Sequence, residues 1–273
     1  MIPVKDELDL IQRNLPSWCR LNPNEILLCF DKPSPQGCVE EALRIGREFR
    51  VVIKILEVGR NPAYRFQQAW IRRSGFRAAR NDTILTGDID LQVFPSCLKS
   101  LELVGQENVG LVSLSKLRRR QGFVGGLRNF MEHTARTYAR AIRKRKAGLV
   151  YFTGLYCISR RYWLDSEPEE SIMSLQNPKT APPIETAWGF YIGEDTHLRD
   201  WMIKKYKVLY LVDIGAVDTR LGLEDSRLIQ YKIGMKFAHD RKGFLRLLLH
   251  ALVHIRPYVI VGYMHRRVTG DSE

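Results

Sequence analysis

Apolar positions follow two different periods along roughly the first hundred residues. Short apolar runs predict strands over 2–4, 25–30, 50–56 and 82–87. Between these runs, apolar residues recur every three or four positions, which predicts helices over 6–18, 38–49 and 63–79. Alternating strands and helices form right-handed crossover units. The pattern therefore predicts an α/β fold, with a mostly parallel sheet that is flanked by helices.

Polar side chains follow three of the predicted strands. Lys5 and Asp6 follow the first strand, Asp31 follows the second, and Asp88 and Asp90 follow the fourth. Ligands of open α/β sheets bind beyond the carboxyl ends of the strands. We therefore expect these side chains to lie at one edge of the sheet and to face a ligand rather than the core.

The pair Asp88 and Asp90 suggests a particular ligand. In an extended backbone, residues i and i+2 share a face, so both carboxylates could reach one point. Mg²⁺ and Mn²⁺ prefer such oxygen ligands and keep coordination positions open for substrate phosphates. The pair therefore predicts a metal site, and a solvated acidic turn is the alternative interpretation.

Composition constrains the partner. The chain has 273 residues, of which 45% are hydrophobic, with a formal net charge of +13 and a pI near 9.7. Such a charge indicates an anionic partner: nucleic acid, a phosphorylated substrate or an acidic membrane surface. The five cysteines are odd in number and widely spaced, which predicts buried, reduced thiols in a cytoplasmic protein.

Several segments, taken in chain order, resemble motifs of glycosyltransferase family 2. They are "IPVKDELDLIQRNLPSW", "EILLCFD", "WIRRSGFRAARNDTILTGDID", "YFTGLYCISRRYW" and "GEDTHLRDWMIKKYKVLYLVD". The resemblance implies the GT-A fold, which is Rossmann-like, over residues 1–215. It also implies transfer of a sugar from a UDP- or GDP-linked donor to an acceptor hydroxyl, with inversion and with Mg²⁺ or Mn²⁺ as the cofactor.

The same resemblance implies roles at the donor site. Pro3, Lys5 and Glu7 belong to the opening segment, which is similar to the family motif I-P-x-x-[DN]-E. Asp31 ends the segment whose terminal aspartate contacts the nucleotide base in that family. Arg72 occupies the arginine position of the family's A-R-N motif. Together with Asp88, these residues are the implied donor-binding set.

The resemblance also implies the metal ligands and the catalytic base. Asp88 and Asp90 fall on the family's metal motif, and Asp195 falls on its general base. A carboxylate at a helix start suits this role, because the helix dipole favours its charged form. One base opposite one leaving group implies inversion. Glu224 and Asp225 form a rival acidic pair, which we interpret as capping or loop residues.

The rest of the chain predicts an appendage. Residues 1–110 would form the nucleotide-sugar-binding half of the GT-A domain, 111–215 the acceptor-side half, and 216–273 a C-terminal helical extension. Basic runs at 118–120 and 140–146 accompany an interrupted apolar segment, "FLRLLLHALVHIRPYVIVGYMHRR". This combination suits a helix lying at a membrane interface. An ordinary packed helix with a basic rim is the alternative.

These patterns give expectations for partners and location. We expect a glycan or a lipid-linked acceptor, and a cytoplasmic protein that could sit peripherally at the inner face of the membrane. Non-enzymatic nucleic-acid binding is an alternative, although no helix-turn-helix, zinc-finger or RNP pattern is present. A nucleotidyltransferase is another, but "IPVKDELD" lacks the glycine-rich loop expected after its first strand.

Overall fold

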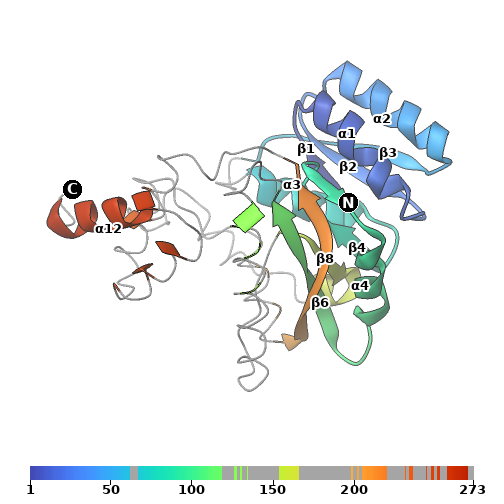
Figure 1. Ribbon diagram of the computed structural model, residues 1–273. Helices are drawn as coiled ribbons and strands as arrows, with labels where there is room; N and C mark the ends of the chain where they lie inside the picture. Colours follow the sequence, from blue (N-terminus) through green and yellow to red (C-terminus); the bar gives the residue numbers. More distant parts are fainter. Residues whose placement is uncertain are drawn as a thin grey trace. The chain divides into compact units, whose positions relative to one another are not determined.

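The structure is a computed structural model that describes residues 1–61, 67–118, 154–165, 205–219 and 257–269, with single residues and pairs between 126 and 252. It divides into two compact units (Figure 1). Unit 1 comprises Met1–Leu117, Gly148–Pro182 and Ile192–Thr219. Unit 2 comprises Arg118–Ala147, Pro183–Tyr191 and Arg220–Glu273. All candidate site residues that the structure describes belong to unit 1.

The first half of unit 1 follows the predicted alternation. Strands β1 (Ile2–Val4), β2 (Ile26–Asp31) and β3 (Ile53–Val58) form a parallel sheet in the order β1-β2-β3. Helices α1 (Leu8–Cys19) and α2 (Gln36–Phe49) connect these strands, and α3 (Gln67–Ala78) and β4 (Thr83–Thr86) follow. The predicted α/β fold, with a parallel sheet flanked by helices, is confirmed here.

A second, mixed sheet has the strand order β4-β7-β6-β8-β5. Besides β4, its strands are β5 (Leu91–Val93), β6 (Val109–Arg118), β7 (Tyr156–Ser159) and β8 (Lys207–Asp218). The short helices η1 (Pro95–Cys97), α4 (Leu98–Leu103) and α6 (Arg160–Asp165) lie between these strands in the sequence. Contrary to expectation, β4 does not extend the parallel ladder but pairs antiparallel with β7. The Met1 amine nevertheless donates to the Leu85 carbonyl at 2.9 Å, so β1 and β4 lie side by side.

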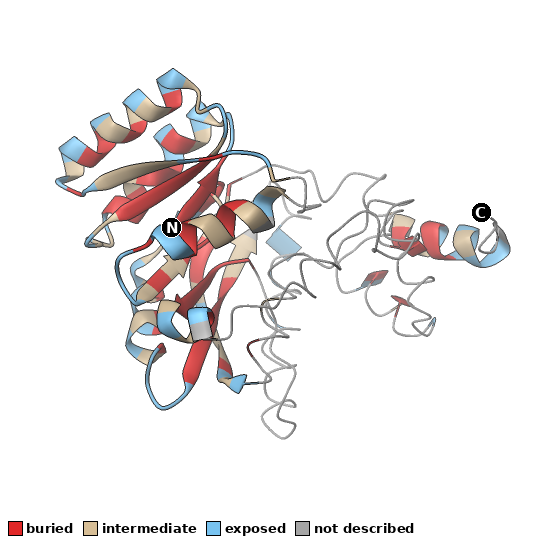
Figure 2. Ribbon diagram, turned by 180° about the vertical axis from the view of Figure 1, so that it is seen from behind, coloured by how far each residue is buried: buried red, intermediate tan, exposed pale blue. Residues whose placement is uncertain are grey.

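The core of unit 1 lies on both faces of β2, which explains the uninterrupted apolar sequence of this strand. Ile26, Leu28 and Phe30 pack in the cluster that contains the buried residues of α1 and α2. Leu27 and Cys29 point to the opposite face, in the cluster that contains Ile71 and Phe76 of α3. Figure 2 shows the strands buried and the outer faces of the helices exposed.

One glycine determines how closely α3 approaches the sheet. A methyl group on Gly75 would lie 2.7 Å from Cys29 Sγ and 2.7 Å from Met1 Cγ. A side chain there would therefore push α3 away from β1 and β2. This close packing positions Arg72, one turn earlier on α3, whose guanidinium reaches Asp88 just beyond the end of β4.

The five cysteines are all free and buried, as predicted. Burial raises the pKa of the Cys29 and Cys97 thiols to about 12, and that of Cys19 to about 11. Thiols in these surroundings remain protonated at neutral pH and react slowly. The cysteines therefore serve as small apolar core residues.

In unit 2, the best-described element is α12 (Pro257–Thr269). Its inner face includes the buried Val259 and Tyr263, which pack with Leu247 and Ala251. Gly262 lets the Tyr231 backbone come close, because a methyl group at Gly262 would lie 1.9 Å from the Tyr231 carbonyl oxygen. Within the part of the chain that the structure describes, no helix is long and apolar enough to cross a membrane.

Candidate active site

The first turn of α3 bridges the ends of β2 and β4. Gln67 Nε2 donates to Asp31 Oδ1 at 3.1 Å, and Gln68 Nε2 donates to Asp88 Oδ1 at 2.9 Å. Asp31 and Asp88 are thus held by consecutive residues of one helix. The structure therefore brings these two predicted carboxylates to the same edge of unit 1, even though their strands belong to different sheets.

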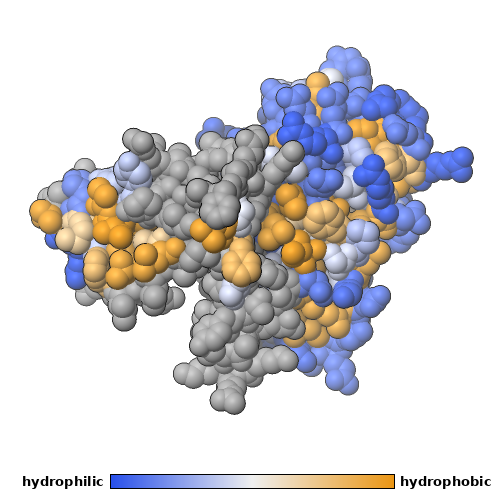
Figure 3. Space-filling model, in the orientation of Figure 1, coloured by the Kyte–Doolittle hydropathy of each residue, from blue (hydrophilic) through white to orange (hydrophobic). Residues whose placement is uncertain are grey.

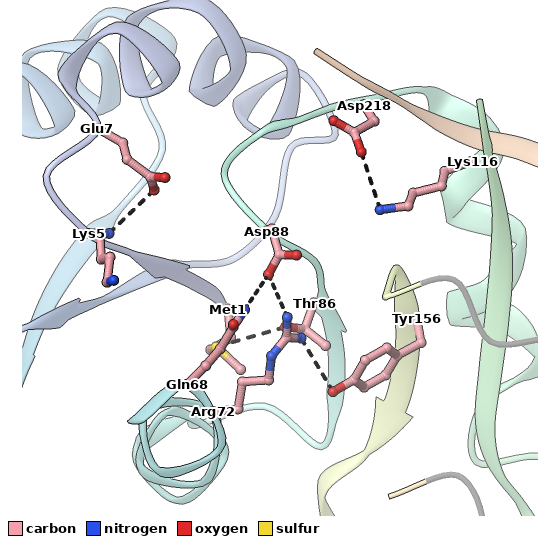
Figure 4. Close-up of polar contacts among 10 residues, drawn as sticks. All are labelled: Met1, Lys5, Glu7, Gln68, Arg72, Thr86, Asp88, Lys116, Tyr156 and Asp218. Carbon is pink, nitrogen blue, oxygen red and sulfur yellow. Dashed lines mark hydrogen bonds and ion pairs between the residues drawn. The ribbon is translucent and has the colours of Figure 1, made fainter. Parts of the chain in front are cut away.

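Arg72 completes the contacts of Asp88. It lies one turn after Gln68, and its Nη2 donates to Asp88 Oδ1 at 2.5 Å (Figure 4). The arginine is only 4% exposed, and its Nη1 also lies 3.5 Å from the Tyr156 hydroxyl. Charge-assisted hydrogen bonds of this kind are stronger than neutral ones. The Arg72 side chain thus fixes the position of Asp88 from within the protein.

The D-x-D segment is a turn and not an extended strand end. Leu91 N donates to the Asp88 carbonyl at 3.1 Å, which closes a four-residue turn. The expectation that strand alternation places Asp88 and Asp90 on one face is therefore wrong. Asp90 is buried at 7% exposure, whereas Asp88 is half-buried. Both carboxylates still come from a single short turn.

A buried network holds this turn against α1. Asn14 Nδ2 donates to the Ile89 carbonyl at 2.9 Å and to Thr219 Oγ1 at 2.8 Å. Thr219 in turn donates to the Asp90 carbonyl from both its backbone N and its Oγ1, each at 2.8 Å. Asn14 is fully buried and Thr219 nearly so. The network ties the backbone on either side of the Asp90 Cα to a helix and to the end of β8.

We expect Asn14→Leu to lower the free energy of unfolding by about 1–3 kcal/mol, because the buried Ile89 carbonyl loses its donor. Nucleotide affinity should fall as well, since the D-x-D turn loses its support. Urea denaturation and calorimetry would measure the two effects. Gln12→Leu, on the exposed face of the same helix, is the control.

Thr219→Val gives a second test of this network. Because Asn14 and Thr219 contact each other, their substitutions should not be additive, with an interaction energy of about 0.5–3 kcal/mol. Additive losses would mean that the two side chains act separately and that the network does not support the turn as a unit.

The predicted donor residues of the first segment lie at the end of β1. Pro3 pairs with Cys29 and Val4 with Phe30, so Lys5 and Asp31 directly follow paired positions of two adjacent parallel strands. The Lys5 backbone N lies 3.4 Å from Glu7 Oε2, so the Glu7 side chain turns back toward the end of β1. The structure thus places Lys5 and Glu7 at the same end of the sheet as Asp31.

A cavity of about 530 Å³ opens at the carboxyl end of β3. Its lining includes Glu57, Gly59, Asn61 and Trp70. The Gly59 carbonyl accepts hydrogen bonds from Trp70 Nε1 at 3.0 Å and from Gln67 Nε2 at 3.3 Å. The cavity is therefore connected, through Gln67, to Asp31.

Sequence reasoning missed an ion pair on the other side of the turn. Lys116 Nζ on β6 lies 3.6 Å from Asp218 Oδ2 at the end of β8, and both side chains are largely buried (Figure 4). In the antiparallel register of β5 and β8, Asp218 lies opposite Leu91, the residue that closes the D-x-D turn. No local sequence signal marks this pair, since its members lie about a hundred residues apart.

Two further predictions lie outside the described residues. They are the proposed base Asp195 and the rival pair Glu224 and Asp225. Among the residues that are described, no group of three His, Cys, Asp or Glu side chains could hold a metal ion.

No family model matches the chain, and no curated protein matches it. Solved structures do match. The mannosyltransferase PcManGT from Pyrobaculum calidifontis, in complex with GDP-Man and Mn2+, aligns with 99% of this chain and 74% of its own, with a TM-score of 0.55 and 16% identity. Residues 1–349 of S. aureus TarS align with 97% of this chain and 90% of theirs, with a TM-score of 0.51 and 12% identity.

The chain has a Rossmann-like fold of the GT-A type. At these identities the likeness shows the fold alone, and the predicted fold class is confirmed by it. The activities of the two matched proteins are their own, so the function of this chain has to be argued from its site.

Proposed function

We propose that the chain is an inverting, metal-dependent glycosyltransferase that moves a sugar from a nucleoside diphosphate donor to an acceptor hydroxyl. One observation carries the proposal: the first turn of α3 holds Asp31 and Asp88 at one edge of a GT-A type fold. Parallel α/β sheets bind their ligands at that edge. The matched PcManGT structure, which contains GDP-Man and Mn2+, supports a donor of this class.

The donor would bind across the ends of β1, β2 and β3. The Asp31 carboxylate would accept hydrogen bonds from N–H groups of the nucleotide base, and Gln67 would fix the orientation of the carboxylate. The cavity beside Gly59 and Trp70 is large enough for part of a nucleoside. Lys5, which follows β1 and is exposed, would provide positive charge for the diphosphate. Pro3 and Glu7 would shape the same end of β1.

Asp88 and Asp90 would hold Mg²⁺ or Mn²⁺. Their carboxylates fit a hard cation, and the diphosphate and water would complete the coordination because the described residues offer no third acidic or histidine ligand. The metal would neutralise negative charge on the departing diphosphate. Arg72 and Gln68 would keep Asp88 in place, and the network of Asn14 and Thr219 would fix the backbone of the turn.

Asp195 would act as the general base. A carboxylate within hydrogen-bond reach of the acceptor hydroxyl can take its proton as the new glycosidic bond forms. The C–O bond to the diphosphate breaks on the opposite face of the sugar, so the anomeric configuration inverts. The acceptor would be a glycan or a lipid-linked hydroxyl compound.

A panel of nucleotide sugars tests the donor class. We expect one UDP- or GDP-linked sugar to raise the melting temperature when Mn²⁺ is present and to have a much smaller effect when it is chelated. At a hundred times its dissociation constant, such a ligand stabilises the folded state by about 2.7 kcal/mol. Equal stabilisation by free nucleoside triphosphates would instead favour a nucleotidyltransferase.

A further inference from the structure

The net positive charge of this protein belongs to unit 2. Unit 2 contains 20 Lys and Arg residues against 7 Asp and Glu, whereas unit 1 contains 23 of each, so unit 2 accounts for the whole net charge of +13. The proposed donor site, which should attract a negatively charged nucleotide, lies in the neutral unit. The basic character therefore needs a partner other than the donor.

Unit 2 also has most of the exposed large apolar side chains. Seven of the eleven among the described residues belong to it: Leu127, Phe130, Phe244, Leu252, Val261, Met264 and Val268. This excess is notable because far fewer residues are described in unit 2 than in unit 1. Exposed apolar groups mark an interaction surface where they are contiguous, and three of these seven residues share the helix α12.

Three of these side chains form a stripe along α12. Val261, Met264 and Val268 follow the spacing i, i+3 and i+7, which places them on one face of the helix. They are 53%, 49% and 81% exposed, whereas Val259 and Tyr263 face the core of unit 2. Figure 3 shows apolar residues on the surface of the region of α12.

Basic residues accompany the stripe. The last turn of α12 contains Arg266 and Arg267, and Arg267 lies over the Tyr263 ring, with 5.8 Å between the guanidinium carbon and the ring centroid. A helix with an exposed aliphatic face and basic residues at its end suits an interface between water and lipid, where the aliphatic groups enter the acyl region and the cations meet headgroups.

We propose that unit 2 docks on an anionic membrane surface, with the Val261–Met264–Val268 stripe of α12 lying in the interface. The charge of unit 2 provides long-range attraction, which salt screens, and the stripe provides apolar burial, which salt does not weaken. The stripe itself suits lipid better than nucleic acid, because its aliphatic side chains cannot stack on bases. The inference does not depend on the proposed function.

Vesicle flotation of the full chain tests the proposal. The protein should float with phosphatidylcholine vesicles that contain phosphatidylglycerol. It should partition at least about 100-fold more weakly to pure phosphatidylcholine, because each basic residue near an anionic surface raises the partition coefficient about fivefold. High salt should reduce binding to the anionic vesicles but leave a measurable fraction. A wild-type protein that remains unbound at low salt would overturn the proposal.

Substitution of the stripe tests which surface docks. In the triple variant Val261→Ser, Met264→Ser and Val268→Ser, binding to anionic vesicles at high salt should fall by at least about tenfold. Val52→Ser, at an exposed valine of unit 1, should bind as the wild type does. Circular dichroism and nucleotide affinity should be the same in both variants, which separates this result from misfolding and from failure of the donor site.

Two results would contradict the role of the stripe. One is a triple variant that binds anionic vesicles at high salt as well as the wild type does. The other is a wild-type dimer in solution that the triple variant dissociates, because the stripe would then be an interface between two copies of the chain. Tighter binding to DNA than to anionic vesicles at equal salt would assign the basic charge to nucleic acid instead.

Discussion

Asp195→Asn is expected to lower sugar transfer by roughly 10²–10⁴-fold while donor binding changes little. Asparagine keeps the size of the side chain but cannot take the proton of the acceptor hydroxyl. The rate at saturating donor and acceptor would measure the first effect, and calorimetry with the nucleotide and Mn²⁺ would measure the second. This combination separates loss of the base from loss of the donor site.

Asp225→Asn is the matched control, because Asp225 also follows a glutamate in the sequence. It should transfer sugar at nearly the wild-type rate. Comparable turnover in Asp195→Asn, together with a collapse in Asp225→Asn, would move the base to the rival pair. Loss of donor affinity in Asp195→Asn would show that this residue acts in binding.

Asp90→Asn is expected to weaken metal-dependent nucleotide binding by more than about 100-fold. Loss of a direct ligand should exceed the roughly 10–100-fold cost of losing a residue that hydrogen-bonds to a metal ligand. Asparagine suits this test better than alanine, because Asp90 is buried and asparagine keeps the volume of its side chain. Calorimetry of UDP and GDP, with Mn²⁺ and with a chelator, would measure the effect.

The acidic control for this experiment is Asp213→Asn. Asp213 lies on β8, is about half exposed, and pairs with Lys99 at 3.3 Å. Its variant should bind nucleotide as the wild type does. If Asp90→Asn instead binds with unchanged affinity and unchanged Mn²⁺ dependence, Asp90 is not a metal ligand and its burial is structural.

The elements of the first ninety residues could be predicted because their cause is local. Apolar spacing within a strand or a helix depends only on neighbouring residues. The predicted start of β3 is wrong by three residues: the strand begins at Ile53 and not at Arg50. Arg50 instead caps the end of α2 in the left-handed conformation, with φ at 56°. Strand pairing depends on distant residues, so the antiparallel partner of β4 could not be predicted.

The candidate site could be predicted only in part, for the same reason. The sequence singled out Asp31, Arg72 and Asp88, and the structure brings them together. The sequence contains no indication of the Lys116–Asp218 ion pair, because its two residues lie on strands that are distant along the chain. Roles beyond this placement remain predictions.

Asn14 could have been found from the sequence. It lies between Ile11 and Leu15 on the apolar face of α1, where the helical pattern requires a core residue. A polar residue at such a position indicates a buried hydrogen-bond network, because an unpaired buried amide is costly. Its partners, the Ile89 carbonyl and Thr219, are distant in sequence and needed the structure.

In the proposed reaction a nucleotide sugar is the donor and its nucleoside diphosphate is the leaving group. Phosphorus NMR tests this claim most directly, by identifying what the protein releases from a panel of nucleotide sugars with Mn²⁺. We expect a nucleoside diphosphate, released slowly to water when no acceptor is present and not released when Mn²⁺ is chelated or Asp90 is replaced by asparagine. Release of pyrophosphate from a nucleoside triphosphate and a sugar phosphate, with no nucleoside diphosphate from any nucleotide sugar, would contradict it.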